Sequence, residues 1–339
     1  MTARTRRSGK RAATAANPAA PPWRSPLVFM AALLAIPVVI AVAAFGLWPS
    51  GDTATAARVT GEPGLVEKVE SLYNDIYLLR RRNGDFALMF GAERVNYVES
   101  IVNPDDEMEL PVYYTQSMTA GLAYAARLDS AAIIGLGGGR TAWYHHKSVP
   151  GLEFTAVELD PEVARIAAQY FGVRPERNFD VVIRDGRVHL ARSEATFDII
   201  LIDAYRGPFV PFHLLTTEFY RLVAEHLRPG GVAVQNVEPS TMLFDSAVAT
   251  IRAAFDHVVF VRGQGNIVIV AYNGDELDEA TVRTRAAERQ AQYGLRYDLT
   301  EILGRRFSPE WNAATEPLTD DFAPVEYLKA IERHNERRG

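Results

Sequence analysis

The chain of 339 residues contains no cysteine, which excludes disulfide bonds, thiolate metal ligands and cysteine nucleophiles. It also lacks the H-E-x-x-H, G-x-S-x-G and Walker patterns that indicate zinc hydrolases, serine hydrolases and P-loop enzymes. The hydrophobic content of 48% is ordinary, so the chain has enough apolar side chains for a sizeable core. These absences leave the cellular compartment open and exclude chemistry that depends on a thiol.

Acidic residues are missing from the first 25 positions, which carry six basic side chains, whereas the rest of the chain carries 30 basic and 42 acidic ones. A body with such an excess of negative charge favours a cationic or neutral substrate over nucleic acid, whose phosphates it would repel. Solubility alone also explains an acidic surface. We therefore expect no nucleic-acid partner.

Charged residues are absent from positions 25–51, and the apolar run at 26–48 is long enough to cross a bilayer as one helix. The basic tail at 1–25 places the N-terminus in the cytoplasm by the positive-inside rule. A cleaved signal peptide is the alternative, because small residues follow the run, although the run is longer than a usual signal core. We predict a single-pass membrane anchor, and leave open on which side of the membrane the soluble part lies.

The remaining chain divides by its hydrophobic pattern. A polar linker at 49–64 precedes a small β-rich domain at 65–112, in which a short helical pattern is followed by alternating, strand-like segments. Residues 113–330 alternate short, apolar, often β-branched runs with helical patterns, and 331–339 form a tail. Apolar strands that alternate with helices predict an α/β fold with a doubly wound parallel sheet covered on both faces.

Glycines crowd into the stretch "IIGLGGGR" (133–140), directly after an apolar run and before a helical pattern. Glycine permits a tight turn and removes the Cβ that would keep the backbone away from a ligand. We therefore take Gly135, Gly137 and Gly139 as candidate ligand-binding residues. A glycine-rich turn alone is a weak signal, because many such stretches are only turns.

The next predicted strand ends in Glu158, 19 residues after Gly139. A doubly wound fold places the carboxylate that binds ribose hydroxyls at this spacing. Asp160 is an alternative ribose ligand, but Pro161 follows it, and this pair is typical of a helix N-cap and first helical residue. Glu158 is therefore the preferred candidate.

Two further predicted strands also end in acids. Asp185, followed by Gly186, lies where an adenine amino group would be bound, and Asp203 ends the strand "FDIILID". Three strand-end carboxylates after a glycine turn predict an adenosine-type ligand. The G-x-G-G-G spacing departs from the G-x-G-x-x-G of dinucleotide sites, which favours an S-adenosyl ligand over NAD.

Several motifs stand in the same order as in the spermidine synthases (polyamine aminopropyltransferases). They are "SLYNDIYLLRR" (71–81), "VNYVESIVNP" (95–104), "IIGLGGGRT" (133–141), "VELDPEV" (157–163), "RDGRVHL" (184–190), "FDIILIDAY" (197–205), "HLLTTEFYRLV" (213–223) and "LTDDFAPVEYL" (318–328). The chain resembles this superfamily from about residue 65 to 330. It is most similar to the membrane-associated branch, in which such a domain is joined to membrane segments.

The resemblance implies a Rossmann-like domain of the S-adenosylmethionine-dependent methyltransferase type after a small β-domain. The implied co-substrate is S-adenosylmethionine or its decarboxylated form, with no metal. In the family an amine attacks the carbon next to a sulfonium, which departs as a neutral thioether. Carried over, Glu158 is the ribose-binding acid, Asp185 the adenine-side acid and Asp203 the base. The implied partners are an amine or polyamine, the membrane and, because such domains commonly pair, a second copy of the chain.

The chain departs from the family at the amine side. The family's D-S-x-D reads Asp-Ala-Tyr-Arg at 203–206, and Gly138 stands where its G-G-G-D-G has aspartate. Its Tyr-His-Glu segment is present only as Tyr-Tyr-Thr, which contains Tyr114. Arg206 in the substrate site would repel a cationic amine. Two alternatives are that it pairs with an acidic acceptor or with the carboxylate of intact S-adenosylmethionine, and that it is a surface arginine with no role in the site. We place Tyr114, Tyr205 and Arg206 on the substrate side.

The favoured hypothesis is aminopropyl transfer to an amine. Methyl transfer from intact S-adenosylmethionine is the alternative that Gly138 and Arg206 favour. A non-catalytic binding or scaffold protein is the third hypothesis, because the donors are made in the cytoplasm and the predicted topology puts the body outside it. We predict structural roles for His213, which precedes a helix, and for Asp320, which is typical of a helix cap.

Overall fold

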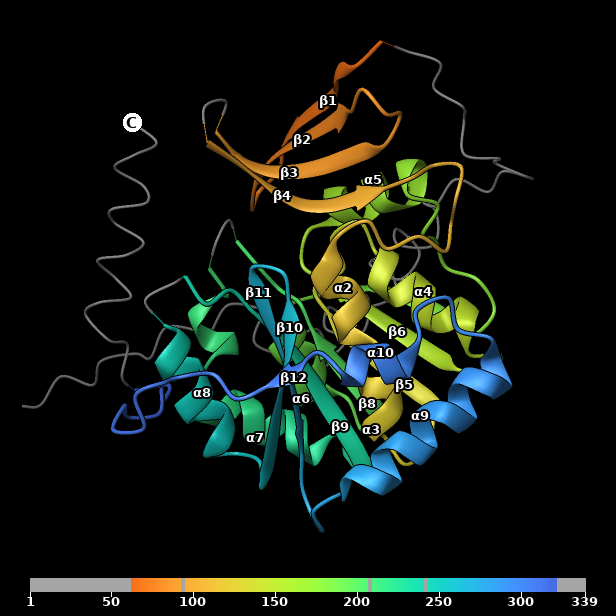
Figure 1. Cartoon of the computed structure of the whole chain (residues 1–339). Coiled ribbons are helices and arrows are strands. Elements are labelled where there is room, and N and C mark those ends of the chain that lie inside the picture. The colour runs from red at the N-terminus through yellow and green to blue at the C-terminus, as the bar shows by residue number, and fades with distance from the viewer. Residues whose placement is uncertain (1–61, 93–94, 207–208, 241–242, 322–339) are drawn as a thin grey trace, which may run out of the picture. The chain divides into compact units, whose positions relative to one another are not determined.

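The computed structural model describes residues 62–92, 95–206, 209–240 and 243–321 (Figure 1). The predicted tails, the membrane segment at 26–48 and nearly all of the linker lie outside these residues and stay predictions, as does the homodimer. No helix in the part of the chain that the structure describes combines the length and the hydropathy needed to cross a membrane.

An antiparallel sheet begins the described chain, with strands in sequence order: β1 (Gly64–Glu70), β2 (Asp75–Arg80), β3 (Phe86–Ala92) and β4 (Val95–Val102). The short helical pattern expected at the start of this region is wrong, because the backbone of β1 pairs with that of β2. Pairing with a neighbouring strand here overrides the local pattern. Ile76, Leu78 and Leu88 are fully buried and belong to the main hydrophobic core.

The larger sheet of the described residues has the order β12-β10-β11-β9-β8-β5-β6-β7. Its parallel strands are β5 (Ser130–Ile134), β6 (Glu153–Glu158), β7 (Phe179–Ile183), β8 (Phe197–Ile202) and β9 (Leu227–Val237). Its antiparallel strands are β10 (His257–Gly263), β11 (Asn266–Tyr272) and β12 (Arg306–Phe307). The predicted doubly wound parallel sheet is therefore present, with an antiparallel extension at one edge.

Successive side chains of the central strands enter two separate cores, one on each face of the sheet. Ile133 and Leu201 lie in the first core, and Ile134 and Ile202 lie in the second. Helices that contribute to the first core are α2 (Tyr113–Met118), α3 (Gly121–Tyr124), α4 (Arg140–Ser148), α5 (Pro161–Tyr170), α9 (Glu279–Tyr293) and α10 (Leu299–Leu303). The second core is covered by α6 (Gly186–Arg192), the 3₁₀ turn η2 (Phe212–Leu214), α7 (Thr217–Glu225) and α8 (Phe244–Arg252).

The two central strands, β5 and β8, are parallel neighbours whose connections run in opposite directions. From β5 the chain continues to β6 on one side, and from β8 it continues to β9 on the other. The loops after β5 and β8 therefore diverge and leave a crevice at the carboxyl ends of the strands. Open α/β sheets bind their ligands at such a topological switch point.

The small sheet contacts the large domain next to this crevice. Ser71, in the turn after β1, donates a hydrogen bond to the carboxylate of Asp160, and Glu67 pairs with Arg165 on α5. Asp160 also accepts a hydrogen bond from the Glu162 amide (3.0 Å), so the predicted N-cap is confirmed. These contacts hold the small sheet against the first turn of α5.

Candidate active site

The glycine turn follows β5 and passes directly against the chain that leaves β8. A Cβ at Gly135 would lie 2.4 Å from the carbonyl oxygen of Asp203, and Gly135 has a φ of +90°. Gly137 (φ +55°) and Gly139 (φ +74°) also lie in the left-handed region that favours glycine. The prediction that this turn requires glycine is confirmed at all three positions.

Gly138 is needed for a different reason. A Cβ there would lie 2.5 Å from two ring carbons of Phe171 and 2.7 Å from the Cβ of Ser100. The Gly138 amide donates to the Ser100 hydroxyl at 2.9 Å, so β4 closes over the turn from the small sheet. No room remains at this position for the acid that the family motif carries.

Glu158 ends β6 beneath the glycine turn and is 9% exposed. Its carboxylate accepts hydrogen bonds from the amides of Leu136 (2.9 Å), Gly137 (3.3 Å) and Asp160 (2.9 Å). Burial raises the pKa of Glu158, and these backbone hydrogen bonds oppose the rise. The carboxylate lines the cavity and also fixes the shape of the turn. The predicted ribose contact stays a prediction.

Replacing Glu158 by glutamine should destabilise the fold by about 2 kcal/mol, because at least one buried amide donor then loses its acceptor. Urea denaturation of the wild type and the variant measures this loss. The matched control is Glu153→Gln at the start of β6, where the side chain is exposed. Equal stability of the Glu158→Gln variant and the wild type would contradict a role in shaping the turn.

Asp185 is the N-cap of α6, and both of its carboxylate oxygens already have partners. One oxygen accepts from the Val188 amide (2.9 Å) and the other from Nε2 of His213 (2.8 Å). The His213 hydrogen bond is the main reason that the pKa of Asp185 is lowered. The next residue is Gly186, whose Cβ would lie 2.2 Å from a methyl carbon of Ile134, so glycine lets α6 approach β5.

Asp203 stands at the carboxyl end of β8, where side chains from three elements meet. Nδ2 of Asn236 at the end of β9 donates to its Oδ1 (2.9 Å), and the hydroxyl of Tyr114 on α2 donates to its Oδ2 (3.2 Å). Burial raises the pKa of Asp203 to about 6, although both hydrogen bonds lower it. A carboxylate of this kind is held in one orientation and binds a proton near neutral pH.

The two residues after Ala204 differ in environment. Tyr205 is half-buried, packs against the second core and donates its hydroxyl to the backbone oxygen of Asn236 (2.8 Å). Arg206 is exposed at the cavity rim. Water screens an exposed guanidinium, so its repulsion of a cationic substrate is much weaker than the sequence alone suggests.

These residues surround one cavity of about 670 Å³. Its walls include the sequence-predicted residues Tyr114, Gly135, Gly137, Glu158, Asp185, Gly186, Asp203, Tyr205 and Arg206. Among the predicted ligand residues, Gly139 does not line it and is instead the N-cap of α4. The sequence therefore identified side chains that the fold brings together.

Sequence reasoning missed two residues at the cavity or beside it: Asn236 contacts Asp203, and Glu99 reaches the cavity from β4. His213, for which a structural role was predicted, contacts the carboxylate of Asp185 and also lines the cavity. Asp320, expected to cap a helix, pairs with Arg187 on α6 (2.5 Å). For Glu99 the signal was its place in the matched stretch "VNYVESIVNP", which did not single out one residue.

The sequence is similar to those of known polyamine aminopropyltransferases. A family model described as "Spermine/spermidine synthase domain" matches residues 114–275. The chain is 30% identical over 302 residues to a probable polyamine aminopropyl transferase of Bifidobacterium longum, covering 81% of this chain and 66% of that protein. It is 29% identical over 282 residues to the polyamine aminopropyltransferase of Vibrio vulnificus, covering 79% of this chain and 93% of that protein.

The chain belongs to the spermidine synthase superfamily. Its curated relatives are transferases by name, which assigns it to that class of enzymes. The fold agrees, because a probable spermidine synthase structure from Corynebacterium glutamicum superimposes with a TM-score of 0.57 at 19% identity, covering 77% of this chain and 98% of that one. The methyltransferase-type Rossmann fold with a small N-terminal sheet, which the sequence predicted, is confirmed.

The chain is also similar to proteins named as methyltransferases. The chain is 29% identical over 257 residues to an N-terminal histidine N-methyltransferase of Emericella nidulans, covering 66% of this chain and 44% of that protein.

Proposed function

We propose that this chain transfers an aminopropyl group from decarboxylated S-adenosylmethionine to an amine. The observation that carries the proposal is Asp203, a half-buried carboxylate with a pKa of about 6 that faces the cavity at the switch point of the sheet. Such a group accepts a proton from an attacking amine at neutral pH.

The nucleoside part of the donor fits the wall formed by the glycine turn, Glu158 and Asp185. The cavity volume of about 670 Å³ is in the range of small-molecule sites, roughly 300–1,000 Å³. Glycines at the turn let the backbone approach a ligand, and the strand-end acids face the same space. In this arrangement the sulfonium lies toward Asp203.

The reaction balances with groups that the site contains. The lone pair of the acceptor nitrogen attacks the aminopropyl carbon next to the sulfonium, and the carbon–sulfur bond breaks as its electrons return to sulfur. The thioether leaves uncharged, and the new ammonium gives its proton to Asp203. Asn236 and Tyr114 each donate to one oxygen of the carboxylate and hold its orientation, and each oxygen keeps a second lone pair that can take the proton.

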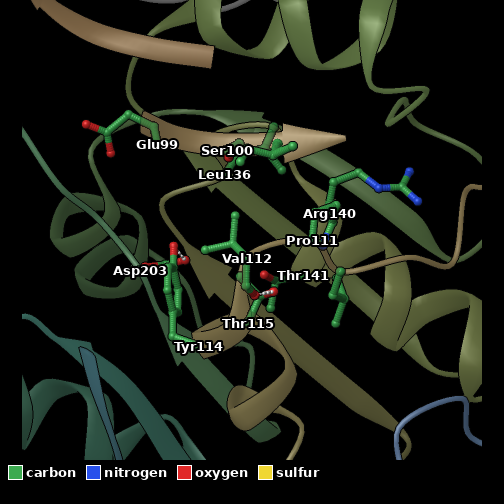
Figure 2. Close-up of a pocket in the computed structure, with 12 residues that line it drawn as sticks. Glu99, Ser100, Pro111, Val112, Tyr114, Thr115, Leu136, Arg140, Thr141 and Asp203 are labelled. Carbon is green, nitrogen blue, oxygen red and sulfur yellow. Dashed lines mark hydrogen bonds between the residues drawn. The ribbon is translucent and has the colours of Figure 1, made fainter. Parts of the chain in front are cut away.

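Electrostatics favour the decarboxylated donor over the intact one. Glu158 and Asp203 face the cavity, and their negative charges would repel the carboxylate of intact S-adenosylmethionine. The second candidate, methyl transfer, is supported by the methyltransferase relatives and by Arg140, whose Nε and Nη2 are buried without a partner among the described residues. However, the guanidinium of Arg140 points away from Asp203 (Figure 2).

The pH dependence of turnover should follow Asp203. Only its unprotonated form accepts a proton, so turnover should fall as the pH drops through about 6. Asn236→Ala and Tyr114→Phe each remove a donor that favours the charged form, so the acid limb should move to higher pH.

Tyr205→Phe is the matched control for this shift, because that hydroxyl bonds to a backbone oxygen and not to Asp203. Measurement of kcat from pH 4 to pH 9 for the four proteins tests the assignment. An acid limb that stays in place in both Asn236→Ala and Tyr114→Phe would argue against Asp203 as the titrating group.

Calorimetric titration of the full chain with S-adenosylmethionine, its decarboxylated form and methylthioadenosine tests the donor. Preference for the decarboxylated donor or its product supports aminopropyl transfer. Preference for the intact donor supports methyl transfer. Absence of binding to all three would leave the scaffold hypothesis.

A further inference from the structure

Glu99 reaches the cavity because the pairing of β4 with β3 is interrupted at this residue. Leu88 pairs with Ser100 and Met89 pairs with Val98, so Glu99 is the extra residue of a β-bulge. Bulges redirect side chains and are frequent next to active sites. Here the bulge lets two consecutive residues, Glu99 and Ser100, line the same cavity.

The two residues have different surroundings. Ser100 accepts the Gly138 amide, so its hydroxyl is part of the turn. Oε1 of Glu99 is buried from solvent, and it has no hydrogen-bond partner among the described residues. Buried carboxylate oxygens almost always have a partner, so this one indicates an unfilled ligand contact. Figure 2 shows a smaller pocket that shares Glu99, Tyr114 and Asp203 with this cavity; these three residues lie on one side of it and Arg140 lies on the other.

The charge around Glu99 points to the chemistry of that ligand. Burial, followed by the negative charges of Asp203 and Glu158, raises the pKa of Glu99 to about 8. A positive group beside Oε1 would offset both the cost of burying the carboxylate and its repulsion by Asp203 and Glu158. A primary ammonium is suited to this position because it carries a positive charge and three hydrogen-bond donors. An anionic or purely apolar ligand would relieve neither.

We propose that Glu99 is a specificity-determining residue that binds a primary ammonium group of the substrate. The proposal rests on the function proposed above. In the family motif the acid at position 138 belongs to the glycine turn, but Gly138 has no room for a side chain, so another residue has to bind the cation. The ammonium belongs either to the aminopropyl arm of the donor or to the far end of a diamine acceptor. Both sources present the same group to Glu99.

The Glu99→Gln variant distinguishes the donor ammonium from the acceptor ammonium, because glutamine keeps the shape of the side chain and removes its negative charge. If the donor ammonium is bound, the variant should bind decarboxylated S-adenosylmethionine about 10- to 100-fold more weakly, the range typical of a charge-assisted hydrogen bond. Its affinity for the dimethylsulfonium analogue of adenosine, which keeps the sulfonium and lacks the ammonium, should not change. If the acceptor ammonium is bound, the KM for a diamine should rise by a similar factor while donor affinity stays constant.

Two further variants complete the test. Glu99→Asp keeps the charge and should recover part of the loss, whereas Glu153→Gln removes an exposed charge at the opposite, amino end of β6 and should leave both constants unchanged. If the wild type bound none of the nucleosides, the proposed function itself would be wrong. A wild type that binds and turns over, beside a Glu99→Gln variant with unchanged Kd and KM or with a change in kcat alone, would overturn the role of Glu99.

Discussion

An Asp203→Asn variant should lose about 10²- to 10⁴-fold in kcat, the usual contribution of a general base. Asparagine has nearly the same shape and still bonds to Asn236 and Tyr114, but it cannot take the proton of the attacking amine. Donor affinity should change little, since the nucleoside contacts lie at the glycine turn and at Glu158. Steady-state kinetics and calorimetry on the same preparation measure both quantities.

The control for Asp203→Asn is Asp180→Asn on β7, where an exposed carboxylate is removed far from the cavity. It should retain the wild-type kcat. If Asp203→Asn retained turnover within a few-fold of the wild type, or if it lost donor binding together with turnover, the assignment of Asp203 as the base would be wrong.

Gly138→Ala should cost about 3 kcal/mol of stability, at the upper end of the usual cost of overpacking a core. The added methyl group would stand 2.5 Å from the ring of Phe171, which is 2% exposed and cannot turn away into solvent. Gly138→Asp, which introduces the aspartate of the family motif, should lower the stability by at least as much. The missing acid at this position is therefore a consequence of how β4 and Phe171 pack on the turn.

A double-mutant cycle tests this explanation of Gly138. Phe171→Leu removes the ring carbons closest to the added methyl group, so Gly138→Ala should cost clearly less in that background. Urea denaturation of the four proteins provides the coupling energy. A Gly138→Ala cost below about 0.5 kcal/mol in the wild type would mean that the turn yields easily, against the overpacking argument.

The sequence predicted those parts of the fold that are set by local chemistry. Apolar strands, the glycine turn after β5, the N-cap at Asp160 and the strand-end acids Glu158 and Asp203 each carry a signal within a few residues. The first strand was misread because pairing with β2, and not its own pattern, decides its conformation.

The partners in the site could not be predicted in the same way. Asn236 contacts Asp203 although the two are 33 residues apart in the sequence, and His213 contacts Asp185 across 28 residues. Glu99 depends on a bulge whose cause is the pairing of β3 with β4. Such meetings are set by tertiary packing, and a single sequence does not show them.

Charge placement accounts for the apparent conflict at the amine side. From the sequence, Arg206 was expected to repel a cationic substrate, but the structure places it exposed at the rim, while the inner walls carry Glu158 and Asp203. A cation that passes the rim enters a region of negative charge. The departures from the family motif are thus compatible with an amine substrate.

Analysis of the products by mass spectrometry tests the central claim most directly. The purified chain is incubated with a diamine and either S-adenosylmethionine or its decarboxylated form. The account predicts methylthioadenosine and the aminopropylated amine from the decarboxylated donor, with both formed at least about 100-fold more slowly by Asp203→Asn. Formation of S-adenosylhomocysteine and a methylated acceptor from the intact donor, with no transfer from the decarboxylated one, would contradict it.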